Sequence, residues 1–156
     1  MKIPRSDRLT AWLSLRGIVL AALCALATAR ADPASGILVE VRGLRSDAGR
    51  VLCDLFASAE AFPSHPERAV ARVSTPIHGG TAACTFSGLA PGQYAVAIVH
   101  DENGNGRLDR IMGMPSEGVG ASRDARGHFG PPRFEDAAVP YPGGFLILTV
   151  KVNYLI

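Results

Sequence analysis

Short runs in which apolar and polar residues alternate set the fold class of this chain. The longest is 145–154 (FLILTVKVNY), where every second residue from Leu146 to Tyr154 is apolar or aromatic. A period of two is typical of a strand with one buried face. Similar or weaker runs occupy 36–44, 50–57, 69–74, 81–86 and 93–99. One more short segment, 134–139, precedes the last turn. We therefore expect about seven strands and no long helix.

Glycine- and proline-rich turns separate these runs, which favours two packed antiparallel sheets over a helical fold. The first two runs flank a turn at 46–49 and are expected to form a hairpin. The segment 88–94 (GLAPGQY) resembles the corner that joins the sheets of immunoglobulin-like and transthyretin-like sandwiches, where the tyrosine, here Tyr94, bonds back across the corner. The predicted fold is a single, all-β, immunoglobulin-like or transthyretin-like antiparallel sandwich.

Periodicity disappears between Arg110 and Arg133. A segment of this length without periodicity, inside a compact domain, is usually a functional loop or disordered. Disorder is not favoured, because the segment has Met, Val and Phe to bury and no strong charge bias. We expect one long, ordered, irregular loop that a neighbouring structure holds in place.

The N-terminus has the pattern of a signal peptide. Basic residues precede an apolar run from Gly17 to Thr28, and Ala29-Arg30-Ala31 has the small-x-small pattern of a cleavage site. An uncleaved membrane anchor is the alternative, although the run is shorter than the roughly 20 residues that span a bilayer. We predict a signal peptide at 1–31, one domain at 32–156, no transmembrane segment after cleavage, and a secreted or periplasmic location.

Cleavage would change the charge of the chain. The segment 1–31 contains five of the 16 Lys and Arg residues and one of the 14 Asp and Glu residues, which leaves 11 basic and 13 acidic residues. The remaining arginines are scattered, so nothing resembles the basic stripe of a nucleic-acid-binding protein.

Two cysteines remain in a chain expected to reach an oxidising compartment. Cys53 and Cys84 each lie on the apolar face of a predicted strand, where a bridge between strands is geometrically possible. Two buried free thiols are the alternative. We predict a Cys53–Cys84 disulfide.

The segment 100–109 (HDENGNGRLD) has oxygen-bearing side chains at the alternate positions that a calcium loop uses. It is not an EF-hand, because Met112 stands at the twelfth position, where a glutamate belongs, and no helices flank the loop. Glu117 is the best candidate to complete the site, followed by Glu102 and Asp136. The predicted cation ligands, for Ca²⁺, are Asp101, Asn103, Asn105, the Arg107 carbonyl, Asp109 and Glu117. The alternative is a turn held only by hydrogen bonds, which Asn-Gly repeats favour.

Other functions are possible for this region. A metal-assisted hydrolase using 100–117 is one, but isolated histidines are more often surface or capping residues, and no catalytic serine or cysteine motif is present. A binding module is another, with an envelope protein, peptide or glycan as ligand on its end loops. The one tryptophan, Trp12, lies in the signal segment, which argues modestly against a glycan platform. A binding or structural module is our preferred interpretation.

Several separated motifs together resemble an uncharacterised bacterial family, domain-of-unknown-function family 2141. They are GLAPGQYAVAIV, HDENGNG, GMPSEGVGAS and GPPRFEDAAV, in that order. The resemblance implies an exported β-sandwich and supplies no catalytic residue, substrate or ligand. Arg110 departs from the family pattern, which has a neutral polar residue at that position, and its positive charge weakens the case for a cation.

Overall fold

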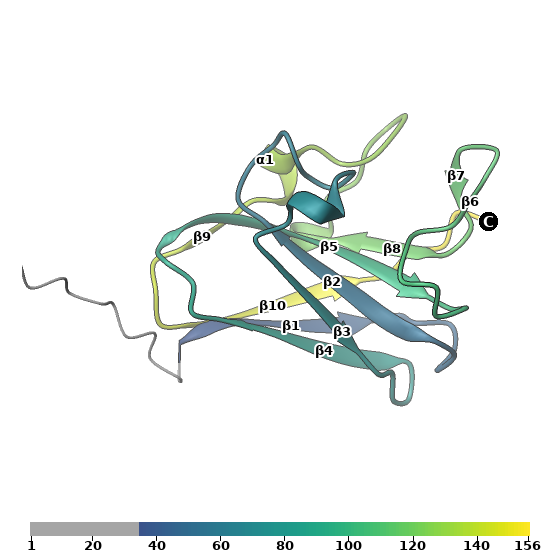
Figure 1. Cartoon of the computed structure of the whole chain (residues 1–156), viewed down its shortest axis with the longest axis horizontal. Coiled ribbons are helices and arrows are strands. Elements are labelled where there is room, and N and C mark those ends of the chain that lie inside the picture. Colours follow the sequence, from purple (N-terminus) through teal and green to yellow (C-terminus); the bar gives the residue numbers. More distant parts are fainter. Residues whose placement is uncertain (1–34) are drawn as a thin grey trace, which may run out of the picture.

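The alternating runs form strands of two sheets that pack face to face (Figure 1). The computed structural model describes residues 35–156, and the predicted signal peptide lies outside them. The three-stranded sheet has the order β10-β1-β4, formed by Phe145–Lys151, Gly36–Arg42 and Thr81–Ser87. The larger sheet has the order β3-β2-β5-β8, formed by Ala71–Thr75, Arg50–Phe56, Gly92–Asp101 and Gly118–Ala121.

Shorter elements complete the fold and raise the number of strands from the expected seven to ten among the described residues. Strand β9 (Val139–Tyr141) pairs with the start of β5, and β6 (Arg110–Ile111) and β7 (Met114–Pro115) form a separate hairpin. The helical turns are η1 (Pro66–Arg68), η2 (Ser122–Asp124) and α1 (Phe134–Ala137). The all-β sandwich is confirmed.

The predicted hairpin between the first two strands is wrong. Strand β1 pairs in parallel with β10 and antiparallel with β4, whereas β2 pairs with β3 and β5 in the other sheet. Alternation shows that each strand has one apolar face but does not show which strand lies beside it. Because β1 and β2 lie in opposite sheets, the apolar face of each strand is buried in the core between the sheets.

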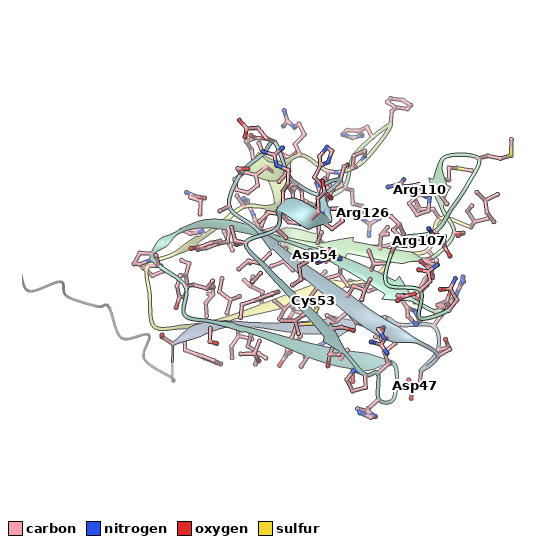
Figure 2. The ribbon with its side chains drawn as sticks, in the orientation of Figure 1. Asp47, Cys53, Asp54, Arg107, Arg110 and Arg126 are labelled. Carbon is pink, nitrogen blue, oxygen red and sulfur yellow. A yellow bond between two sulfur atoms is a disulfide. The ribbon has the colours of Figure 1, made fainter. Side chains whose placement is uncertain are left out.

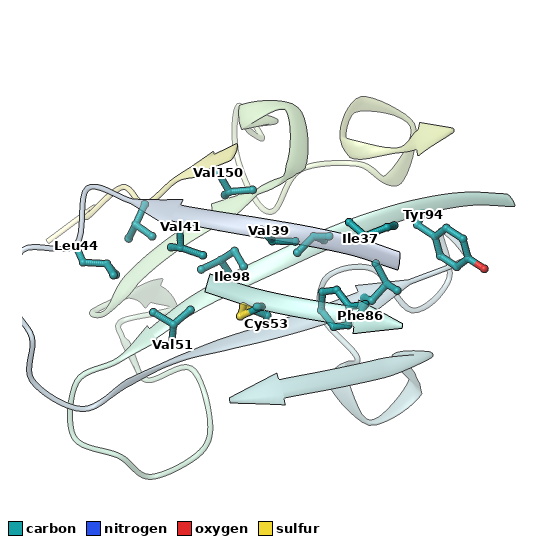
Figure 3. Packing of buried hydrophobic residues seen from close by; sticks show 14 of the residues in the cluster. Ile37, Val39, Val41, Leu44, Val51, Cys53, Phe86, Tyr94, Ile98 and Val150 are labelled. Atoms are coloured by element: carbon teal, nitrogen blue, oxygen red, sulfur yellow. A yellow bond between two sulfur atoms is a disulfide. The ribbon is translucent and has the colours of Figure 1, made fainter. Parts of the chain in front are cut away.

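That core lies between the two sheets (Figure 3). The side chains of Ile37, Val39 and Val41 on β1 are fully buried against residues of the larger sheet such as Leu55 and Ile98. Removing apolar surface of this kind from water is the main stabilising contribution to such a fold.

A disulfide joins the two sheets through this core. Cys53 of β2 is bonded to Cys84 of β4, with a Cα–Cα distance of 6.5 Å, so the predicted bridge is confirmed. Closing a loop with a sequence separation of 31 residues stabilises a fold by about 3–4 kcal/mol in the chain-entropy account.

A second apolar cluster covers the outer face of the larger sheet near the start of β5. The ring of Phe62 meets that of Phe56 on β2 edge-on, at 5.5 Å, and that of Phe134 at 6.1 Å. The predicted strand at 134–139 is wrong, because Phe134 begins the helical turn α1 and strand structure starts only at Val139. Residues three apart share a helix face, so the turn directs both Phe134 and the buried Ala137 into this cluster.

The predicted tyrosine corner is present, and the hydroxyl of Tyr94 donates to the carbonyl of Ala90 at 2.9 Å. The predicted irregular segment is more regular than expected, because it contains the β6–β7 hairpin and β8. Strand β8 passes close to the end of β10. A Cβ on Gly118 would collide with Tyr154 and Val152, so glycine allows this approach. Among residues 35–156, no helix is long and apolar enough to cross a membrane.

Candidate functional site

The loop 102–109 follows the end of β5 on the larger sheet and leads into β6. Successive residues of a strand point to opposite faces, and at this end of β5 both His100 and Asp101 are fully buried. The neighbouring turn fixes the path of the chain at Gly49, which has φ 68°. It lies against the main chain of Asp101 and Glu102, where there is no space for a Cβ.

The carboxylate of Asp101 is turned back into its own loop. Its Oδ1 accepts the main-chain N–H of Asn105 at 3.0 Å, and its Oδ2 accepts that of Gly106 at 2.8 Å. A buried carboxylate is tolerated when hydrogen bonds of this kind compensate for lost water. Gly106 has φ 80°, a left-handed conformation that glycine adopts without strain. Asp101 is therefore the structural centre of the loop.

Three further side chains converge beside it. The amide nitrogens of Asn103 and Asn105 both donate to the same oxygen, Asp109 Oδ2, at 2.6 and 2.8 Å. These two amides, Asn103 first, hold the pKa of Asp109 below its usual range. The amide oxygens accept main-chain N–H groups, Asn103 from Asn105 and Asn105 from Arg107, each at 3.0 Å. An amide oxygen has two lone pairs, so each retains capacity for a second partner.

Glu117 closes the loop from outside. It lies immediately before β8 and is only 4% exposed. Its Oε1 accepts the main-chain N–H of Glu102 and its Oε2 that of Asp109, both at 3.0 Å. One carboxylate thus joins the two ends of the loop and anchors the chain that returns from the β6–β7 hairpin. Glu117, the residue expected from the sequence to complete this loop from outside, meets the loop as a hydrogen-bond acceptor.

The other candidate residues lie around this arrangement in different ways. The side chain of Arg107 is on the outer side of the loop, with its Nε 3.5 Å from Asp109 Oδ1. The carboxylate of Glu102 is held by Arg45 rather than turned into the loop. Asp136 lies on α1 and pairs with Arg133, and α1 is near the start of β5 whereas the loop is at its end. The structure therefore brings together Asp101, Asn103, Asn105, Asp109 and Glu117.

The ligand atoms that these five side chains offer determine which ion the loop could hold. In residues 35–156, no three His, Cys, Asp or Glu side chains are grouped so that they could hold a metal ion. The loop instead offers carboxylate, amide and main-chain oxygens, which are the ligands of hard cations such as Ca²⁺ rather than of zinc or copper. Part of the present oxygen capacity is used by N–H groups, so any cation would compete with hydrogen bonds already made.

His100 is buried rather than at the surface, and it binds a main-chain carbonyl, as a capping histidine does. Its Nε2 is 2.9 Å from the carbonyl of Ala48, and its Nδ1 is 2.7 Å from the hydroxyl of Tyr154. A carbonyl can only accept, so Nε2 carries the proton of that hydrogen bond. Both ring nitrogens are engaged and the ring is fully buried, an arrangement that keeps it away from a substrate.

Arg45 makes contacts at this loop that the sequence does not predict. Its guanidinium makes two hydrogen bonds to Glu102, at 2.6 and 3.0 Å, and lies over the Tyr154 ring, 4.4 Å from its centroid. Its main-chain N–H also donates to the Tyr154 hydroxyl at 2.9 Å. The hydrogen bond from Arg45 lowers the pKa of Glu102. Arg45 thereby connects the first residue of the loop to the C-terminal segment. Its partners Glu102 and Tyr154 are 57 and 109 residues away in the sequence, so no local pattern predicts these contacts.

These features define a small all-β sandwich with a hydrogen-bonded, oxygen-rich loop at the end of a central strand. The chain belongs to the family described as uncharacterised proteins conserved in bacteria, DUF2141, whose model matches residues 39–144. No curated protein and no solved structure matches the chain. The family match confirms the resemblance found in the sequence and assigns no activity.

Proposed function

We propose that this protein is an exported binding or structural module of the bacterial cell envelope whose loop at 101–109 binds Ca²⁺. Asp101, Asn103, Asn105, the Arg107 carbonyl and Asp109 would contribute oxygens, and Glu117 would complete or brace the site. The observation that carries the proposal is the convergence of the Asn103 and Asn105 amides on one oxygen of Asp109. Alternate side chains of a tight loop meet in this way when they surround one centre.

The same hydrogen bonds explain how the loop is organised before a cation arrives. The turn formed by Asp101 and the bridge formed by Glu117 fix the main chain. The amide groups of Asn103 and Asn105 stabilise the ionised form of Asp109. A cation would displace the amide nitrogens from Asp109 and use the second lone pair of each amide oxygen, so the hydrogen bonds of those oxygens to the main chain could remain. A preorganised loop loses less conformational entropy on binding, which favours affinity.

Thermal unfolding of the purified protein, with Ca²⁺ and with chelator, tests the proposal. A ligand that binds only the folded state adds about 2.7 kcal/mol at a hundredfold excess over its Kd. For a domain of this size that corresponds to an increase in melting temperature of about 10 °C. We expect such an increase for the wild-type protein at millimolar Ca²⁺.

Asp109→Asn is the matched test variant, because it keeps the shape of the side chain and removes one charge. The control is Asp47→Asn, an exposed aspartate that accepts two main-chain N–H groups in a separate turn, from Gly79 and Gly80. We expect the calcium-dependent increase to disappear in Asp109→Asn and to persist in Asp47→Asn. Superimposable wild-type curves with calcium and with chelator, or an increase that survives Asp109→Asn, would contradict the proposal.

A further inference from the structure

Two segments project from the outer side of the larger sheet, away from the three-stranded sheet (Figure 1). One is the β6–β7 hairpin and the other is the loop 125–133 between η2 and α1. They carry the two most exposed large apolar side chains in the described part of the chain, Met112, which is 95% exposed, and Phe129, which is completely exposed. Beside Met112, Ile111 and Met114 are each more than half exposed.

Met112 also has a backbone conformation that is unfavourable for methionine. Arg110 pairs with Pro115 and Ile111 with Met114, which leaves a two-residue turn of Met112 and Gly113 with φ 50° and 84°. A hairpin turn with two left-handed residues favours Asn-Gly, because a residue with a Cβ is disfavoured in that region. Water also disfavours a thioether at a tip. Neither the turn nor the solvent accounts for methionine here, and a contact outside the fold would.

The charges around these tips are arranged asymmetrically. Residues 107–133 contain five arginines and three acidic residues. All three acids are turned onto internal donors: Asp109 onto the two loop amides, Glu117 onto main-chain N–H groups, and Asp124 onto the N–H of Lys151 at 3.0 Å. The negative charge of this region therefore already has hydrogen-bond partners within the fold.

Two of the five arginines already have partners: Arg133 pairs with Asp136, and Arg123 donates to a main-chain carbonyl. The other three are less fully paired. Figure 2 labels Arg107, Arg110 and Arg126 on the side of the molecule from which the hairpin projects. Arg110 donates to the carbonyl of Gly113 at 3.2 Å and Arg126 to the amide oxygen of Asn153 at 2.9 Å. Within residues 35–156, neither guanidinium pairs with a carboxylate, and Arg107 makes only the 3.5 Å contact with Asp109.

From this arrangement we infer that the face formed by Met112, Phe129 and the three arginines docks onto an anionic phospholipid surface. The two tips enter the interfacial region, and the guanidinium groups pair with lipid phosphates. Two separate, protruding apolar tips suit a deformable lipid surface, in which each tip is buried independently. Basic residues beside such tips favour anionic headgroups. The inference does not rest on the calcium proposal, because the residues varied in its test are not proposed calcium ligands; only Arg107, which is left unchanged, also belongs to the calcium loop.

Co-sedimentation of the purified protein with vesicles tests this inference. Vesicles of phosphatidylcholine alone are compared with vesicles of equal parts phosphatidylcholine and phosphatidylglycerol, with chelator present. We expect binding to the anionic vesicles that weakens with added salt. Phe129→Ser and Met112→Asn should each reduce partitioning about tenfold or more, since burying such a side chain contributes about 1.5–3 kcal/mol. Arg110→Gln and Arg126→Gln should each reduce it about fivefold.

Met112→Asn also separates binding from folding, because asparagine suits the turn better and the variant should melt at the same or a higher temperature. The matched control is Phe145→Ser with Ile147→Ser, which removes apolar side chains of 58% and 55% exposure from the three-stranded sheet. All variants share the same N-terminal segment, so its contribution to partitioning cancels.

Three results would overturn the inference. They are no partitioning onto anionic vesicles, full partitioning by the Met112→Asn, Phe129→Ser double variant, or an equal loss in the Phe145, Ile147 control. Self-association of the wild-type protein in sedimentation, lost in the double variant and without vesicle binding, would assign the face to a second protein instead.

Discussion

Glu117→Gln tests the architecture of the loop most informatively. The side chain is 4% exposed, and each of its oxygens accepts one main-chain N–H, from Glu102 and from Asp109. A glutamine of the same shape offers one oxygen and one NH₂ group. One of the two main-chain donors therefore loses its acceptor and faces another donor.

The magnitude follows from the two bonds. A hydrogen bond to a charged group contributes about 1.5–3 kcal/mol, and a buried donor left without a partner costs about 1–3 kcal/mol. The remaining bond also loses its ionic component. We therefore expect Glu117→Gln to lower the free energy of unfolding by about 2–3 kcal/mol, or the melting temperature by about 10 °C for a domain of this size.

Circular dichroism melting with chelator present measures this effect without any cation contribution. Native-state hydrogen exchange adds a local measurement, and the amides of Glu102 and Asp109 should lose protection in the variant. The matched control is Glu60→Gln, whose side chain is 80% exposed and 3.6 Å from Arg68. Pairs of this kind contribute little, so the control should change little. A Glu117→Gln protein as stable as Glu60→Gln, with both amides still protected, would refute the bridging role of Glu117.

Two other predictions concern the disulfide in the core and the loss of stability at acid pH. Replacing both Cys53 and Cys84 by alanine should lower the free energy of unfolding by about 3–4 kcal/mol or more, measured by urea unfolding; an undiminished midpoint would contradict the cross-sheet role of the bridge. The pKa of Asp109 is lowered in the folded state, so its contribution to stability is complete above its unfolded pKa of about 4 and is lost as the pH falls through the lower folded value. Urea unfolding over that pH range, with chelator, should therefore show that the free energy of unfolding falls less steeply with decreasing pH in Asp109→Asn than in the wild-type protein. Identical slopes would contradict this prediction.

The sequence predicts the strands whose burial alternates and misses those whose signal is not local. Strands β1 and β10 follow the alternation of their side chains, but their parallel pairing joins residues more than 100 positions apart. Strand β8 escapes notice because its sequence is GVGA. Its glycines are required for close approach to β10, and they remove the apolar pattern by which a strand is recognised. Phe134–Ala137 has no apolar alternation, and in the structure it is a helical turn whose Phe134 ring packs against Phe62.

The candidate site divides in the same way. Asp101, Asn103, Asn105 and Asp109 lie within nine residues, so their spacing alone predicts that they converge. Glu117 is eight residues beyond and could be predicted because the long segment needs an anchor. The Arg45 contacts with Glu102 and Tyr154 depend on two turns and the C-terminus meeting at one end of the sandwich. Only the assembled fold brings them together.

The calcium proposal is tested most directly by the amide ¹H–¹⁵N spectrum of the purified protein during titration with Ca²⁺. We expect saturable shifts that are largest for residues 101–109 and Glu117, and that are absent in Asp109→Asn but retained in Asp47→Asn. A spectrum that does not change at millimolar Ca²⁺, or one whose changes lie elsewhere in the chain, would contradict it and leave the loop as a turn held by its hydrogen bonds.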